Sequence, residues 1–164
     1  MSSRTKNSGF TLIELIVIIL LVSIVSVYAA SRYTGSRSIT AQLLESELLS
    51  SLRLTQLRAM HRNGLCGRWL VAENQAAHVS PSASEGACVT SISNNDRKDS
   101  SFVDAAAKGG NLSIVTNSGQ HYLDFDSLGR VTQCTASDCK VSVQTTSGEV
   151  RSICINYQGG IDGC

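Results

Sequence analysis

A single carboxylate, that of Glu14, stands at the start of a long apolar run. The residues from Leu15 to Ser31 carry no charge and are mostly isoleucine, leucine and valine. An ionised side chain inside a membrane segment costs about 2.5–3.5 kcal/mol on insertion scales, so Glu14 needs a charged partner. Cleavage between Gly9 and Phe10 would supply one, because the new α-amine would lie four residues before Glu14, within reach along one helical face or from a neighbouring chain. Such a cut would be a covalent step that serves an electrostatic purpose.

Six cysteines form the second group of reactive side chains. They are Cys66, Cys88, Cys134, Cys139, Cys154 and Cys164. An even number of cysteines in an exported domain indicates a disulfide framework, although six cysteines allow 15 connectivities and their spacing does not select one. We expect neighbours to pair, as Cys66 with Cys88, Cys134 with Cys139, and Cys154 with Cys164.

The histidines and the remaining motifs give no sign of catalysis. His61, His78 and His121 are far apart and lack H-E-x-x-H spacing, so we expect polar residues of the surface or of strands. A zinc site made of Cys134, Cys139 and His121 is the alternative, but it lacks a C-x-x-C pair, and an oxidising compartment disfavours free thiolates. No G-x-S-x-G, P-loop or dinucleotide fingerprint occurs. We predict a protein that is not an enzyme and that has no metal or cofactor.

The apolar run is the element that must position Glu14. Residues 10–31 form a predicted transmembrane helix, since about 20 apolar residues at 1.5 Å each match the hydrocarbon core. Arg4 and Lys6 precede this segment, and positive residues before a first apolar helix stay in the cytoplasm. The rest of the chain is then exported, which agrees with its cysteine content.

An ordinary secretory signal peptide is the alternative reading of the N-terminus, with cleavage after Ala29. Such a peptide has an apolar region of 7–15 residues, and a carboxylate near the start of that region serves no purpose. We therefore favour processing at Gly9.

Residues 32–63 have the pattern of an amphipathic helix, with Gly35 as a kink and residues 63–64 as the stop. Its predicted buried stripe consists of Leu44, Leu48, Leu52 and Ala59, widened by Leu54 and Leu57.

Beyond this helix the sequence takes on the pattern of strands. They are predicted at residues 65–72, 112–116, 122–125, 129–134, 140–145 and 149–157. Turns rich in Asn, Asp, Ser and Gly separate the later strands, as hairpins require. Residues 80–101 are polar and serine-rich, which predicts an exposed loop held at Cys88. The predicted fold class is α+β, a helix on an antiparallel sheet stapled by disulfides.

The motif at residues 9–14, with the sequence GFTLIE, resembles the class III signal of type IV pilins and type II secretion pseudopilins, G-F-[ST]-L-x-E. The resemblance implies that prepilin peptidase cleaves after Gly9, that Phe10 becomes the N-methylated terminus, and that Glu14 helps to dock the subunit into a filament. It also implies a type IV pilin fold, with other major and minor pilins and the inner-membrane assembly platform as partners. Before assembly the protein would be a single-pass inner-membrane protein with a periplasmic head, and afterwards it would lie in a pilus at the cell surface.

Two further stretches resemble subfamilies of these proteins. Residues 125–130, FDSLGR, are similar to the F-x-x-x-G-R turn of the H-type (GspH-like) minor pseudopilin domain. Residues 154–164 resemble the ending of MshC-type minor pilins of the mannose-sensitive haemagglutinin (MSHA) pilus. Together the resemblances divide the chain into leader 1–9, transmembrane or filament-core helix 10–31, amphipathic helix half 32–63 and β-rich periplasmic head 64–164.

These features leave three functions to compare. The first is a minor type IV pilin of the MSHA type, at the tip or along the shaft, and the second is an H-type pseudopilin of type II secretion. The third is a minor pilin that captures DNA or adheres to a surface ligand. DNA capture needs a basic patch, such as one formed by Arg130, Lys140 and Arg151, but residues 64–164 hold ten acidic and seven basic side chains. We therefore expect assembly rather than nucleic-acid binding.

Overall fold

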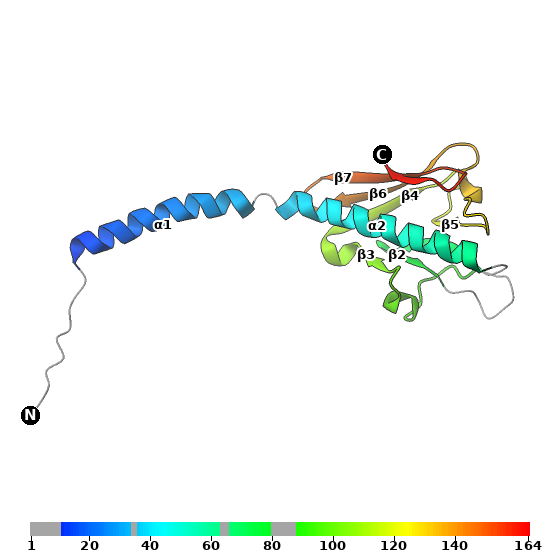
Figure 1. The fold of residues 1–164 in the computed structure, drawn as a ribbon, viewed down its shortest axis with the longest axis horizontal. Coiled ribbons are helices and arrows are strands. Elements are labelled where there is room, and N and C mark those ends of the chain that lie inside the picture. Colours follow the sequence, from blue (N-terminus) through cyan, green and yellow to red (C-terminus); the bar gives the residue numbers. More distant parts are fainter. Residues whose placement is uncertain (1–10, 34–35, 63–65, 80–87) are drawn as a thin grey trace, which may run out of the picture. The chain divides into compact units, whose positions relative to one another are not determined.

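The structure is a computed structural model that describes residues 11–33, 36–62, 66–79 and 88–164, with the side chains of residues 28–39 excluded (Figure 1). The chain divides into two compact units, residues 1–36 and 37–164, which are described separately below.

The first unit contains one long helix, α1 (Leu12–Tyr33). Thr11 caps its first turn, because the backbone N–H of Glu14 donates to both the carbonyl and the side-chain oxygen of Thr11, at 3.1 and 3.4 Å. The hydroxyls of Ser23 and Ser26 donate hydrogen bonds to backbone carbonyls of the preceding helical turn. All side chains described in this helix are exposed, although most are apolar.

Within the described residues, no helix has the length and apolar character needed to cross a membrane. The predicted membrane segment 10–31 includes residue 10 and the side chains of residues 28–31, which lie outside the described part of the chain. It stays a prediction.

The second unit is built on α2 (Ser36–His61). The predicted stripe is confirmed, since Leu44, Leu48, Leu52 and Ala59 are all buried. Leu57 was wrongly assigned to this face and is exposed, because its position around the helix points away from the stripe. Ser51 and Thr55 take its place, together with Ala41. The predicted kink at residue 35 and stop at residues 63–64 lie outside the described residues.

The strands form two four-stranded antiparallel sheets. The first sheet has the order β3-β2-β1-β5, with β1 Arg68–Ala72, β2 Gln75–His78, β3 Val103–Asp104 and β5 Tyr122–Asp124. In β1, Trp69 pairs with His78 on one side and with Leu123 on the other. A two-residue turn joins β1 to β2, with φ of 51° at Glu73 and 61° at Asn74, the left-handed conformation that tight hairpins use.

The second sheet has the order β4-β6-β7-β8, with β4 Gly110–Val115, β6 Cys139–Thr145, β7 Val150–Ile155 and β8 Ile161–Gly163. Burial alternates along β6 as the sequence predicts. Val141, Val143 and Thr145 are buried, whereas Lys140 and Gln144 are exposed. One face of this sheet therefore lies in the core.

The core lies between α2 and both sheets, and Figure 1 shows α2 running across their strands. Leu44, Leu48 and Leu52 of α2 meet Trp69 and Leu123 of the first sheet and the inner residues of the second sheet, Val141, Val143, Ile153, Ile155 and Ile161. The α+β class and the packing of a helix on antiparallel strands are confirmed.

The structure corrects three expectations about strands and loops. Residues 129–134 are not a strand, since they form one bridge between Phe125 and Val131 and then a 3-10 turn, Thr132–Cys134. Strands β2, β3 and β8 were not predicted. The described part of the polar loop is also less exposed than expected, because Asp96 and Ser101 are buried. Hydrogen bonds, rather than apolar burial, order this segment.

Three disulfides join neighbouring cysteines, the same pairs as in the neighbour scheme. They are Cys66–Cys88, Cys134–Cys139 and Cys154–Cys164. No cysteine is free. Since Cys134 and Cys139 are bonded to each other, neither is a thiolate that could bind zinc with His121.

Candidate functional site

The N-terminal motif occupies the start of α1. Gly9 and Phe10 lie outside the described residues, so their roles stay predictions. Glu14 is in the first turn, where a carboxylate favours the positive end of the helix dipole. Its side chain is exposed and makes no hydrogen bond or ion pair with another described residue. The carboxylate is thus accessible to a partner.

Helix α1 presents a continuous apolar surface. Its large apolar side chains between residues 12 and 27 are exposed by amounts that range from 39% at Ile16 to 77% at Leu12. Exposed apolar surface of this extent marks contact with a protein or a membrane, because soluble proteins seldom leave it in water. The motif and this surface form the candidate assembly site.

A cluster of polar side chains, most of them buried, lies against α2; we call it the α2 polar cluster. Its buried members are Ser51 and Thr55 of α2, Trp69 of β1, His78 of β2, and Ser101, and its less buried members are Arg58 of α2, Asp99 and Ser100. The Trp69 indole donates to the Ser51 hydroxyl at 2.8 Å, and that hydroxyl donates to the Ser101 carbonyl. The Thr55 hydroxyl donates a hydrogen bond to the backbone carbonyl of Ser51 at 2.9 Å. These bonds satisfy polar groups that burial would otherwise penalise.

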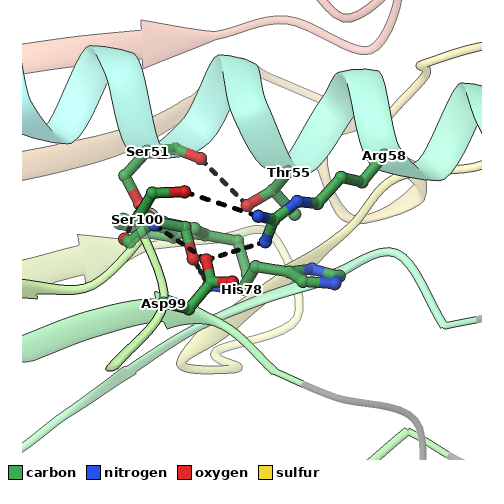
Figure 2. Close-up of polar contacts among 8 residues, drawn as sticks. Ser51, Thr55, Arg58, His78, Asp99 and Ser100 are labelled. Atoms are coloured by element: carbon green, nitrogen blue, oxygen red, sulfur yellow. Dashed lines mark hydrogen bonds and ion pairs between the residues drawn. The ribbon is translucent and has the colours of Figure 1, made fainter. Parts of the chain in front are cut away.

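An ion pair forms part of this cluster (Figure 2). The Arg58 guanidinium donates to the Asp99 carboxylate at 2.8 Å, and the Ser101 backbone N–H donates to the same oxygen at 2.8 Å. Burial alone would raise the pKa of Asp99, but the hydrogen bonds from Arg58 and Ser101 outweigh it and lower the pKa to about 2. Asp99 therefore stays ionised and ties the segment after β2 to α2.

His78 lies on a strand, which is one of the two expected places for the histidines, and it is buried at the end of β2. Its backbone N–H donates to the Ser101 hydroxyl at 3.0 Å. Its Nδ1 is buried and has no hydrogen-bond partner among the described residues. Burial, and next the charge of Arg58, lower the pKa of the imidazole. His61 and His121 are exposed as expected.

The turn at residues 126–130 lies against α2. The Asp126 carboxylate accepts from the backbone N–H groups of Leu128 and Arg130, both at 2.9 Å, and from the Arg130 guanidinium. The Gln56 side chain of α2 donates to the carbonyls of Gly129 at 2.9 Å and Gly159 at 2.8 Å. Gln56 thus joins the helix to two turns that are far apart in the sequence.

Sequence reasoning missed Gln56 because one glutamine on a helix carries no signal of its partners. Of the two glycines that it contacts, Gly129 lies in a predicted turn. Both adopt the left-handed conformation, with φ of 78° at Gly129 and 87° at Gly159.

Two of the three cations considered for a DNA-binding patch have nearby counter-charges. Arg130 pairs with Asp126 at 2.8 Å, and Arg151 pairs with Glu149 at 2.9 Å. Lys140 is exposed on β6. Local carboxylates thus neutralise two of the three charges that would have to contact phosphate.

In the part of the chain that the structure describes, no group of three or more His, Cys, Asp or Glu side chains is arranged to hold a metal ion.

Comparisons with known proteins add two similarities. Residues 4–30 match the prokaryotic N-terminal methylation motif. The chain is also similar to the crystal structure of the type IV minor pilin FimU of Pseudomonas aeruginosa, with 15% sequence identity and a TM-score of 0.49, over 76% of this chain and 87% of that one. A similarity at this level does not establish a common family. No curated protein matches the sequence.

Proposed function

We propose that this protein is a minor type IV pilin, of the MSHA type, that takes part in pilus assembly. The observation that carries the proposal is the match of residues 4–30 to a methylation motif that continues into a helix with an exposed apolar surface. A helix of this kind has to be covered by lipid or by other helices. The FDSLGR turn and the helix-on-sheet head are compatible with the same class of protein.

The proposed mechanism begins with processing. Prepilin peptidase removes residues 1–9 and methylates the amine of Phe10. Residues 10–31 hold the precursor in the inner membrane, with residues 64–164 in the periplasm. On transfer from the assembly platform to the filament, the Glu14 carboxylate pairs with the Phe10-type amine of a neighbouring pilin. Its exposed position in the first turn of α1 leaves it free to do so.

The second unit contributes a compact head. Gln56, the Arg58–Asp99 ion pair and the buried leucines hold α2 on the sheets, and the three disulfides restrain the loops and the C-terminal strand. Such a head sets a fixed position within an assembly. DNA capture is less well supported, because Arg130 and Arg151 are paired within the head.

An H-type pseudopilin of type II secretion is the second candidate. The observation that favours it is the turn at residues 126–130. The Asp126 carboxylate stabilises this turn through a hydrogen bond from the Arg130 backbone, and the Gly129 carbonyl accepts a hydrogen bond from Gln56 of α2. Capture of partner subunits from the producing cells separates the two candidates: pilins of an MSHA-type pilus support the first, and type II secretion pseudopilins support the second.

Gene deletion with complementation tests the assembly role. Deletion should abolish or reduce piliation seen by electron microscopy, and the wild-type gene should restore it. A Glu14→Ala variant should insert and be cleaved but fail to restore filaments, whereas Glu14→Asp, which keeps the charge, should restore them at least in part. Normal piliation in a clean deletion would count against an essential role, and full complementation by Glu14→Ala would remove Glu14 from the mechanism.

A further inference from the structure

His78 occupies a position where a charge is difficult to accommodate. It is the last residue of β2, only 6% exposed, and its Nδ1 lacks a hydrogen-bond partner among the described residues. A buried polar atom without a partner has lost its hydrogen bonds to water and gained none in return, which destabilises the folded state. A histidine in such a site is held in its neutral form, because the imidazolium would need two hydrogen-bond acceptors and a counter-ion.

The charged groups around the imidazole are mostly positive. Arg58 and Arg62 act on it from α2, and Asp99 acts on it from the segment after β2. Arg68 of β1 contributes a backbone hydrogen bond, while its guanidinium is engaged with Asp124 at 2.7 Å. The only carboxylate in this set, Asp99, already binds Arg58 and Ser101. Figure 2 shows His78 below the Arg58 guanidinium and beside Asp99.

The polar side chains around His78 attach α2 to the first sheet. The Arg58–Asp99 ion pair and the bonds among Ser51, Trp69 and Ser101 link the helix to β1 and to the segment after β2. His78 itself is tied to Ser101 through its backbone N–H. A charge on the imidazole would therefore appear inside the contact between helix and sheet.

We propose that His78 is an acid-sensitive switch in the attachment of α2 to the first sheet. Its protonation adds a third positive charge beside Arg58 and Arg62, competes with Arg58 for Asp99, and loosens residues 99–101 and the end of β2 from the helix. The inference rests on these contacts alone and does not depend on the proposed function.

The direction of the pH effect follows from linkage. A base whose pKa is lower in the folded than in the unfolded protein contributes its full stability above the unfolded pKa, about 6.5 for histidine, and loses it as the pH falls below that value. Burial and then Arg58 lower the pKa of His78. The attachment should therefore be tight at pH 7.5 and weaker at pH 5. If His78 stays neutral in the folded state, the unfolding constant rises about 30-fold between these pH values.

Two measurements on the full chain in detergent micelles test this inference. In the first, NMR follows the ring protons of the three histidines from pH 8 to 5, with His61→Gln and His121→Gln for assignment. His78 should titrate below the ordinary histidine value of about 6.5, or not at all within the folded range. Titration of His78 at or above about pH 6.5, the ordinary value for histidine, would overturn the proposal.

The second measurement is hydrogen exchange of the backbone amides, expressed as protection factors to remove the intrinsic pH effect. Amides of residues 78 and 99–101 should lose about tenfold or more protection between pH 7.5 and 5, while those of β6 and β7 lose less. In His78→Gln this difference should disappear, and His121→Gln should keep it. Equal protection at both pH values in the wild-type protein would overturn the proposal, even if His78→Gln does not fold.

Discussion

Replacing Gly159 by alanine should destabilise the protein more than the same replacement at Gly148, although the two glycines have nearly the same backbone conformation. Their φ values are 87° and 85°. A Cβ atom on Gly148 would have no heavy atom within 4 Å apart from those of Gly148 itself and its two neighbours in the chain. A Cβ atom on Gly159 would overlap the carbonyl oxygen of Gly129 and lie 2.5 Å from Nε2 of Gln56. The pair therefore separates the cost of the conformation from the cost of the contact.

The expected magnitudes follow from these surroundings. An L-residue in the left-handed region costs about 1–2 kcal/mol, and this is the whole expected effect of Gly148→Ala. At Gly159 a steric cost of about 1–3 kcal/mol is added, and the Gln56 hydrogen bonds, worth about 1 kcal/mol each, are strained or lost. We expect Gly159→Ala to lose about 3 kcal/mol or more, a large part of a typical stability of about 5–15 kcal/mol.

Urea unfolding of the full-length protein in detergent micelles provides the assay. Trp69 is the only tryptophan and is fully buried, so its fluorescence reports the folding of the head. The free energies of unfolding of the wild type and the two variants are compared at one pH with the disulfides intact. Losses for Gly148→Ala and Gly159→Ala that agree within about 0.5 kcal/mol would refute the close packing of the two turns against α2.

Three further predictions use the same unfolding assay. Gln56→Ala should lower the free energy of unfolding by about 2 kcal/mol, because two hydrogen bonds are lost. Gln42→Ala, on the exposed face of the same helix, should change it little. Equal effects of the two replacements would contradict the Gln56 contacts. Leu48→Ala should cost about 2–5 kcal/mol and Leu57→Ala far less, and the reverse order would contradict the orientation of α2. The pKa of Asp99 is lowered from 3.8 to about 2, so the stabilisation that its carboxylate provides is complete above pH 4 and is lost as the pH falls towards 2. The Asp99→Asn variant should therefore lose less stability than the wild type over that range. An acid dependence that is the same in both proteins would argue against the ion pair.

Patterns of apolar residues predicted the parts of the fold that depend on local periodicity. Leu44, Leu48 and Leu52 recur every four residues, and the core requires that stripe of the helix. The alternation along β6 likewise matches a sheet with one buried face. The cysteines pair with neighbours in the chain, so the simplest scheme agrees with the structure.

The remaining features depend on contacts between distant residues. Strand β2, with the sequence QAAH, contains no β-branched or aromatic residue, and it forms because β1 and β3 pair with it on either side. Ser51 and Thr55 were not predicted in the core, because their burial depends on Trp69 and Ser101, which supply hydrogen-bond partners. A polar residue on a helix is buried only where such partners exist, and the local sequence does not show them.

Similar reasoning applies to the candidate site. The motif at residues 9–14 is local and is recognisable in the sequence alone, whereas the buried state of His78 and the contacts of Gln56 required the folded head.

The N-terminus of the mature protein tests the central claim most directly. The protein should be isolated from membranes and from sheared surface filaments of the cells that produce it, and then analysed by intact mass and N-terminal sequencing. Processing as a pilin predicts a chain that begins at Phe10, lacks residues 1–9 and carries one methyl group on its terminal amine. A mature protein that begins at Ala30, or one that retains residues 1–9 in both fractions, would contradict the account.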